Sequence, residues 1–291
     1  PRGWTAATLA GRPAELFHDV SPRLQDELAT AMARVRDNGL GLQTVQPEDI
    51  RLPSFARDVP ALRARLDHGH GFVVVRGIDV AHYSGVDCAV IHWAFSNYMG
   101  RVVRQNLSGL RVETLKDRRK PDGDPYRLSE TNRFFGFHSD NGGLEPRTPD
   151  YIGLFCRERA MRGGESILVS SYALHNAVLE ARPADLPLLY ETYDAAKPGL
   201  QHDAAGAGTL RYPVFERRGG DLVMRYNRVF IEAGMARAGR PLAGARLALF
   251  DFLDARMADA AMVFRHTLQP GEILFSNNLT TLHGRTAYED W

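Results

Sequence analysis

The chain has 291 residues, 44% of them apolar and 24% charged, a balance that excludes a disordered or low-complexity protein. Lys and Arg total 36 against 35 Asp and Glu, so the net charge is +1 and no nucleic-acid partner is indicated. No apolar run approaches the ~20 residues of a membrane-spanning helix, and the first residues lack the apolar core of a secretion signal. The only cysteines, Cys88 and Cys156, are typical of free thiols in a reducing compartment, so we expect a cytoplasmic protein without a membrane partner.

The first hundred residues show mainly helical patterns. Ser21 and Pro22 are typical N-cap and first-turn residues of a helix, and apolar residues follow at helical spacing until Gly39 ends the run. The other elements that we expect here are helices over Pro60–Asp67 and Ser84–Tyr98 and a buried strand over Gly71–Gly77.

After residue 100 the pattern changes to short β-prone runs with a few helices between them. Strands are predicted over Arg101–Gln105, Leu110–Leu115, Phe134–His138, Tyr151–Cys156, Val214–Arg217, Leu222–Tyr226, Val263–Leu268 and Ile273–Ser276, and helices over Tyr172–Arg182 and Ala243–Ala258. Gly219 and Gly220 between two of the strands indicate a β-hairpin. This order predicts a mainly β protein with flanking helices, a sandwich or barrel rather than alternating βαβ units.

One short stretch offers the side chains of a metal site. His138 and Asp140 lie two positions apart, and residues i and i+2 of a strand point to the same face. Two histidines and one carboxylate with open coordination positions form the facial triad of non-haem Fe(II) oxygenases, and His283 is the natural third ligand. The triplet alone is a weak signal, because a surface His before a turn Asp gives the same pattern.

Several segments together resemble the TauD/TfdA family of Fe(II)- and 2-oxoglutarate-dependent dioxygenases, a branch of the clavaminate-synthase-like superfamily. They occur in the family's order and are Gly71–Gly77 (GFVVVRG), Phe137–Asp140 (FHSD), Pro149–Cys156 (PDYIGLFC), Gly163–Ser171 (GGESILVSS), Arg225–Arg228 (RYNR) and Asn277–Asp290 (NNLTTLHGRTAYED). The resemblance implies a double-stranded β-helix, the jelly roll of cupin-like proteins. We expect one dioxygenase domain over residues 1–291, with a helical part over about 1–100 and a jelly-roll core over about 70–291.

The same resemblance implies a ligand set and a reaction. It assigns His138, Asp140 and His283 to Fe(II), and it assigns Ser166 to 2-oxoglutarate, the alternative for Ser166 being a hydroxyl that is satisfied at a strand start. With O2 as the second cosubstrate, the expected reaction is hydroxylation of a C–H bond of an amino acid or small biosynthetic intermediate, with release of succinate and CO2. The carboxylate at Asp140 argues against the related halogenases, which lack it.

The family also needs an Arg that clamps 2-oxoglutarate some 11 to 14 positions after the distal His, and here it would lie beyond Trp291. We therefore expect the chain to continue past that residue. Arg285 is too close to His283 for this role and is interpreted either as a residue that supports the metal ligands from behind or as a purely structural residue.

The substrate residues are less defined. Gln105 stands where some members that act on free amino acids hold the substrate, although a plain strand residue is the simpler interpretation. Other pocket candidates are Ser129, Asn132, Arg225 and Arg228, each of which could equally lie in a turn or on a solvated face.

Several alternatives stay open at this stage. The chain could be a desaturase or cyclase of the same family, a zinc-dependent hydrolase or isomerase on a cupin-like fold, or a non-catalytic binding domain. A homo-oligomer is compatible with the sequence.

Overall fold

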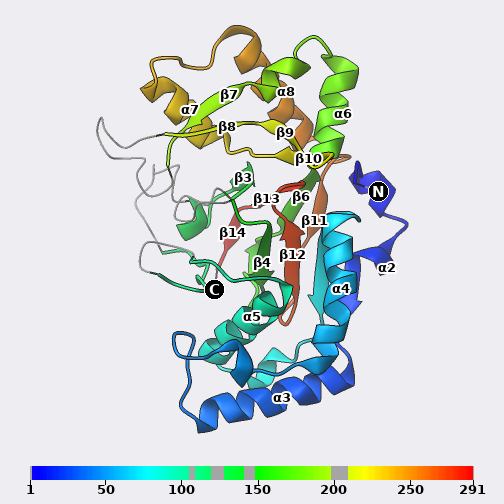
Figure 1. Ribbon diagram of the computed structural model, residues 1–291, viewed down its shortest axis with the longest axis vertical. Helices are drawn as coiled ribbons and strands as arrows, with labels where there is room; N and C mark the ends of the chain where they lie inside the picture. Colours follow the sequence, from blue (N-terminus) through cyan, green and yellow to red (C-terminus); the bar gives the residue numbers. More distant parts are fainter. Residues whose placement is uncertain (1, 105–108, 119–127, 141–147, 198–208, 291) are drawn as a thin grey trace.

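The computed structural model describes residues 2–104, 109–118, 128–140, 148–197 and 209–290. Along its longest axis the chain forms three tiers, with helices at one end, β-sheets in the middle, and helices with short hairpins at the other end (Figure 1). The candidate site lies where the middle tier meets the hairpin tier.

Two four-stranded sheets make the middle tier. The first contains β1 (Phe17–Asp19), β2 (Phe72–Arg76), β12 (Ile273–Asn277) and β4 (Tyr151–Phe155), and the second contains β11 (Phe264–His266), β6 (Ser166–Ser170), β13 (Thr281–Arg285) and β3 (Phe135–His138), each in spatial order. In the first sheet β1 runs parallel to β2 and the other neighbours are antiparallel. The second sheet is antiparallel throughout.

Alternation along β2 shows how the sheets divide the core. Val73 and Val75 pack against the helices outside the first sheet, whereas Phe72 and Val74 point inward and meet Leu168 of the second sheet. Successive strand residues face opposite sides, and both sides are covered here. The continuous apolar run between Gly71 and Gly77 therefore marks a strand that is buried on both faces.

The lower tier packs on the outer face of the first sheet. Its helices are α3 (Pro22–Asp37), α4 (Pro53–Asp67) and α5 (Gly85–Met99). Helix α3 begins as the sequence predicts, because the Ser21 side chain accepts a hydrogen bond from the Leu24 N–H and Pro22 needs no partner in the first turn. Helix α4 starts well before the predicted Pro60, which lies inside the helix.

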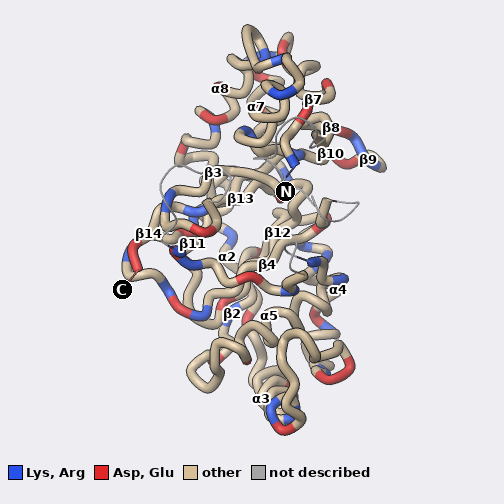
Figure 2. Tube along the Cα trace, turned by 90° about the vertical axis from the view of Figure 1, so that its left-hand side faces the viewer, with Lys and Arg blue, Asp and Glu red and all other residues tan. Residues whose placement is uncertain are grey.

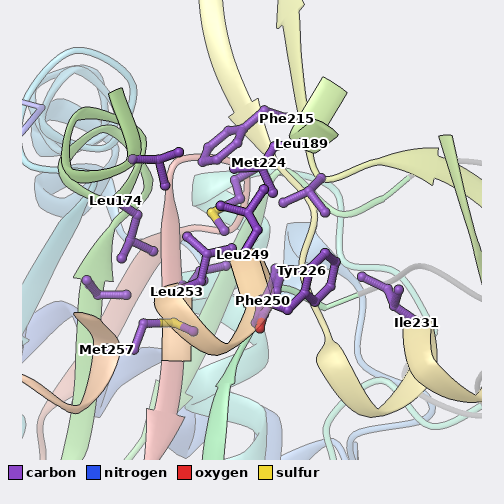
Figure 3. Close-up of a cluster of buried hydrophobic side chains, with 14 of the residues drawn as sticks. Leu174, Leu189, Phe215, Met224, Tyr226, Ile231, Leu249, Phe250, Leu253 and Met257 are labelled. Carbon is purple, nitrogen blue, oxygen red and sulfur yellow. The ribbon is translucent and has the colours of Figure 1, made fainter. Parts of the chain in front are cut away.

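The upper tier packs on the outer face of the second sheet through Ile167, Val169 and Leu282. Its elements are α6 (Ser171–Ala181), β7 (Thr192–Ala195), β8 (Leu210–Pro213), β9 (Phe215–Arg218), β10 (Asp221–Met224), α7 (Arg228–Arg237) and α8 (Gly244–Ala258). Figure 3 shows side chains from these hairpins and helices meeting in one apolar cluster, with Tyr226 beside Phe250. This tier thus has a core of its own above the sheets.

An N-terminal arm closes the space between the two sheets. Trp4, Leu9 and Leu16 are buried with the inward-facing sheet residues, and the arm itself forms α1 (Ala6–Leu9) and α2 (Pro13–Leu16). The Trp4 indole N–H donates to the His70 carbonyl at 2.5 Å, and its ring meets Phe72 edge-on at 5.4 Å. The arm is therefore part of the sandwich core.

Short elements complete the fold. They are the two-stranded pair β5 (Arg162–Gly163) and β14 (Tyr288–Glu289) and the 3-10 turns η1 (Pro47–Asp49), η2 (Val80–His82), η3 (Leu128–Glu130) and η4 (Leu186–Tyr190). No helix among the described residues is long and apolar enough to cross a bilayer. Basic and acidic residues are interspersed along the described chain (Figure 2), and Cys88 and Cys156 are free thiols.

The structure confirms most of the predicted elements and corrects two strands. The hairpin at Gly219 and Gly220 forms with positive φ at both glycines. The described part of the predicted strand Arg101–Gln105, residues 101–104, forms no strand. The predicted strand over Leu110–Leu115 is likewise irregular backbone. Val102 and Val112 pack against the helical core of the lower tier, so burial rather than strand pairing explains the β-branched residues there. Helix α7 adds to the helices expected, and the fold is mixed α and β rather than mainly β.

Replacing Trp4 with Ala tests whether the arm belongs to the core. Removing a buried aromatic side chain leaves a cavity, so the free energy of unfolding should fall by about 3–5 kcal/mol in a urea titration. Leu179→Ala is the matched control, because Leu179 is exposed on α6 and should change stability by less than about 0.5 kcal/mol. Equal effects of the two substitutions would show that the arm is not part of the cooperative core.

Candidate metal centre

Pairing of β3 with β13 brings His138 and His283 together. The two residues are direct partners in the antiparallel register, and such partners share one face of a sheet. The register shifts between His283 and Arg285. A Cβ on Gly284 would lie 2.6 Å from the Phe135 carbonyl oxygen, so only glycine lets β3 approach β13 this closely.

Asp140 completes a compact group of three potential ligands. One ligand atom from each of His138, Asp140 and His283 lies within 4.8 Å of the others. The Nε2 atoms of His138 and His283 lie 3.5 and 3.8 Å, respectively, from Oδ1 of Asp140. The centroids of the two imidazole rings are 4.2 Å apart. His138 is only 6% exposed, which contradicts the interpretation of this triplet as a surface His before a turn Asp.

The protonation of His283 and Asp140 suits metal binding. Burial and the neighbouring His138 lower the pKa of His283 to about 3, so this imidazole is neutral at pH 7, the form that binds a metal. Burial is the largest single influence on Asp140 and raises its pKa, but the hydrogen bond with His138 and the electrostatic effects of His283 and His138 together outweigh it and lower the pKa to about 2. The carboxylate is therefore ionised and ready to coordinate a cation.

The hydrogen bonds around the histidines leave nitrogen lone pairs for a metal. His138 Nδ1 lies 2.9 Å from the Gly136 carbonyl oxygen, and a proton on Nδ1 leaves Nε2 free for coordination. The Phe135 ring stacks on the His138 ring at 4.1 Å. His283 Nδ1 is buried without a hydrogen-bond partner in the described chain. Two imidazoles and one carboxylate on one side, with positions left open, fit Fe(II) and also fit catalytic zinc.

Asn278 holds the backbone of Asp140 and was not singled out from the sequence. Its Oδ1 accepts the Asp140 N–H at 2.8 Å, and its Nδ2 donates to the Asp140 and Pro149 carbonyls, both at 2.9 Å. The Asn278 side chain is fully buried, and an amide has both the acceptor and the donors that this arrangement needs. The one feature of the sequence that could have pointed to this role is the position of Asn278, directly after Asn277 in the segment Asn277–Asp290 that also contains His283.

The residue between the two first ligands is tied to the upper tier. The Ser139 N–H donates to the Tyr226 carbonyl at 2.7 Å, and the Tyr226 N–H donates to Ser139 Oγ at 2.9 Å. The Tyr226 hydroxyl in turn donates to Asp254 on α8 at 2.8 Å. The hairpin tier therefore fixes the chain between His138 and Asp140.

Ser166 lies on the same sheet face as the ligand pair. Strand β6 pairs with β13 so that Leu168 is opposite His283 and Ser166 is opposite Arg285. Ser166 and Leu168 are two positions apart and face the same side. The Ser166 side chain is buried, two positions along the sheet from the candidate metal centre.

The predicted substrate residues separate into three groups. Gln105 lies outside the described residues. Ser129, half-buried, and Asn132, exposed, belong to the segment that leads into β3. Arg225 directly precedes Tyr226, so its backbone is next to the ligand segment.

The two arginines of the RYNR motif have different surroundings. Arg228 contacts Glu232, Asp251 and Asp254, each at 2.7 Å, so its guanidinium is engaged in ion pairs within the upper tier. Arg225 stacks on the Tyr212 ring at 4.0 Å. Its Nε is buried without a hydrogen-bond partner, and no ion pair joins Arg225 to another described residue.

Comparisons with known proteins identify relatives over most of the chain. The family model described as "Taurine catabolism dioxygenase TauD, TfdA family" matches residues 37–291. The chain is 25% identical over 274 residues to FR-33289 synthase of Streptomyces rubellomurinus, covering 92% of this chain and 77% of the relative. It is 24% identical over 287 residues to the taurine hydroxylase-like protein SAT17 of Stachybotrys chartarum, covering 90% and 68%.

Solved structures with the same fold include two oxygenases. Asparagine oxygenase in complex with Fe(II), hydroxyasparagine and succinate has a TM-score of 0.67 at 16% identity, covering 94% of this chain and 88% of that one. The non-heme iron oxygenase OrfP in complex with Fe and alpha-ketoglutaric acid has a TM-score of 0.60 at 18% identity with the same coverage. At these identities the likeness shows the fold.

Removing the Asn278 side chain tests its role beside Asp140. Asn278→Ala deletes three hydrogen bonds to backbone, two of them on Asp140, so Mn2+ affinity measured by calorimetry should fall by about 10–100-fold. Asn38→Ala, at an exposed helix end, is the control and should bind as the unaltered chain does. Unchanged affinity in a folded Asn278→Ala protein would contradict the role.

Proposed function

The chain belongs to the TauD/TfdA family and is therefore an Fe(II)- and 2-oxoglutarate-dependent dioxygenase. We propose that it hydroxylates a C–H bond of a small amino-acid-like substrate, and that His138, Asp140 and His283 hold the iron that performs this reaction. The observation that carries this assignment is the approach of the three ligand atoms to within 4.8 Å of one another. Two strands and one following residue supply these ligands, and their donor types match the facial triad.

In this proposal each residue has a defined task. His138 and His283 bind the metal through Nε2, and Asp140 binds it through its carboxylate. When bound, Fe(II) would supply the chemistry by which O2 oxidises both 2-oxoglutarate, to succinate and CO2, and the substrate. Ser166, on the neighbouring strand, donates a hydrogen bond from its hydroxyl to 2-oxoglutarate. The retained carboxylate of Asp140 leaves no ligand position for a halide.

The arginine next to the ligand segment supports an anionic substrate. Arg225 is half-buried on Tyr212, and no carboxylate among the described residues pairs with it. A partly buried guanidinium without a counter-ion is costly, and its planar fork matches a carboxylate or a similar oxyanion. Hydroxylated amino acids are bound in the structures of asparagine oxygenase and OrfP, which supports a free α-carboxylate as the group that Arg225 holds. Ser129 and Asn132 would then line the same pocket.

The packing of the two sheets supports a jelly-roll fold. Phe72, Val74 and Leu274 of the first sheet meet Leu168 of the second across a shared interior. Two four-stranded sheets facing each other support a double-stranded β-helix in a single domain. The chemistry would then take place at one open end of that double-stranded β-helix.

Replacing Asp140 with Ala tests the ligand assignment. Removing one of three ligands should reduce O2-dependent succinate formation to below about one hundredth of wild type, because the ligands act as a unit. Asp37→Ala, at the exposed end of α3, should leave the rate unchanged. Succinate formation that survives in Asp140→Ala would refute the ligand set. Substrate turnover by the unaltered chain without O2 or 2-oxoglutarate would favour a zinc hydrolase or isomerase instead.

Arg225→Gln tests the anion preference. A panel of amino acids and their amides should show faster succinate formation with the free carboxylates, and Arg225→Gln should raise KM for the best acid by about 10–100-fold, because charged hydrogen bonds are lost. The amide should be affected little, and Arg225→Lys should recover part of the loss. Arg217→Gln on β9, whose residue is exposed, is the control. Equal effects on acid and amide would contradict the assignment.

A further inference from the structure

We propose that Arg285 is a positioning residue of the metal centre, whose guanidinium fastens the segment 128–133 to strand β13 and thereby fixes the approach to His138. The proposal rests on the proposed function, because it concerns the same centre. Arg285 would touch neither the metal nor the substrate, and it would act through the backbone that carries His138.

The proposal is based on three hydrogen-bond contacts between one nitrogen of the Arg285 guanidinium and backbone carbonyl oxygens. Arg285 Nη2 lies 2.6 Å from the Thr131 carbonyl oxygen, 3.0 Å from that of Arg133 and 3.5 Å from that of Leu128. All three acceptors are backbone atoms of the segment directly before β3. A single side chain on the strand of one imidazole therefore holds the segment that enters the strand of the other.

Tyr288 adds a second attachment at the same place. The Arg285 guanidinium lies 4.5 Å from the centre of the Tyr288 ring, a cation–π distance. The Tyr288 N–H donates to the Asn132 carbonyl at 2.9 Å. The segment 128–133 is thus held from Arg285 and from the strand that follows it.

The strand pairing explains why a side chain is needed here. His138 pairs with His283, but the register shifts between His283 and Arg285. The regular ladder of backbone hydrogen bonds therefore does not extend unchanged to the start of β3. Arg285 supplies directional hydrogen bonds at this irregular point, where backbone pairing is weakened.

The surroundings of Arg285 fit positioning better than surface charge. Arg285 is partly buried, and no carboxylate among the described residues forms an ion pair with it. The Arg285 Nε is buried, and no described residue accepts a hydrogen bond from it. A desolvated cation is expensive unless it is hydrogen-bonded, so the carbonyl contacts compensate for that cost. Lysine has a compact ammonium on a flexible stem, so it could donate to some of these carbonyls but would lose the planar guanidinium that lies against the Tyr288 ring.

Two substitutions and a matched control test the inference. Arg285→Met keeps an apolar stem and removes the donors, whereas Arg285→Lys keeps the charge. Arg162→Met is the control, because Arg162 is an exposed arginine on β5 that pairs with Glu289 at 2.9 Å. Hydrogen exchange by mass spectrometry follows the backbone of 128–138, and anaerobic calorimetry gives the dissociation constant for Fe(II).

The expected result has two parts. Exchange over 128–138 should accelerate by about tenfold or more in Arg285→Met, less in Arg285→Lys and not at all in Arg162→Met, while β6 and β12 stay protected. The Fe(II) dissociation constant should rise by about tenfold in Arg285→Met, by less in Arg285→Lys and not at all in Arg162→Met. Tyr288→Leu, which removes only the ring, should give a smaller change of the same sign and keeps the test available if Arg285→Met does not fold.

Two outcomes would overturn the inference. Unchanged exchange over 128–138 in a folded Arg285→Met protein would show that Arg285 does not hold the segment. Faster exchange with an unchanged Fe(II) dissociation constant would show a structural tether that does not position the centre. Failure of the proposed function is distinguishable, because Asp140→Ala would then bind Fe(II) as tightly as wild type whatever the result at Arg285.

Discussion

The pairing of β3 with β13 is the interaction on which the candidate centre depends. It places His138 opposite His283, although the two residues are 145 positions apart in the sequence. The absence of a side chain at Gly284 allows this approach, because a Cβ there would meet the Phe135 carbonyl oxygen at 2.6 Å. A shift of the pairing by one residue would turn one imidazole to the opposite face, so the chemistry of the site requires this register.

The third ligand depends on contacts from outside β3. Asp140 follows the strand, and its backbone is held by the buried amide of Asn278. Ser139 is bound to Tyr226, whose ring lies in the core of the upper tier (Figure 3). The carboxylate is therefore positioned jointly by the β12–β13 connection and by the hairpin tier, and a disturbance in either reaches the metal centre.

Three arginines near the candidate centre have different partners, and the partners of each guanidinium determine what that arginine does. Arg228 is neutralised by acidic side chains of α7 and α8, Arg285 is satisfied by backbone carbonyls, and Arg225 has only an aromatic ring beneath it. The first stabilises a tier of the fold and the second holds a segment. The third keeps hydrogen-bonding capacity for a ligand, because neither a carboxylate nor a carbonyl uses it within the described residues.

The sequence by itself determined the local elements and the types of the ligands. The Ser21 cap, the buried run of β2 and the glycine hairpin follow from rules that act over a few residues. Tertiary structure decided the rest, because packing against distant residues has no local signature. It assigned Val102 and Val112 to the helical core instead of strands, paired Arg228 with carboxylates up to 26 positions away, and placed Asn278 against Asp140.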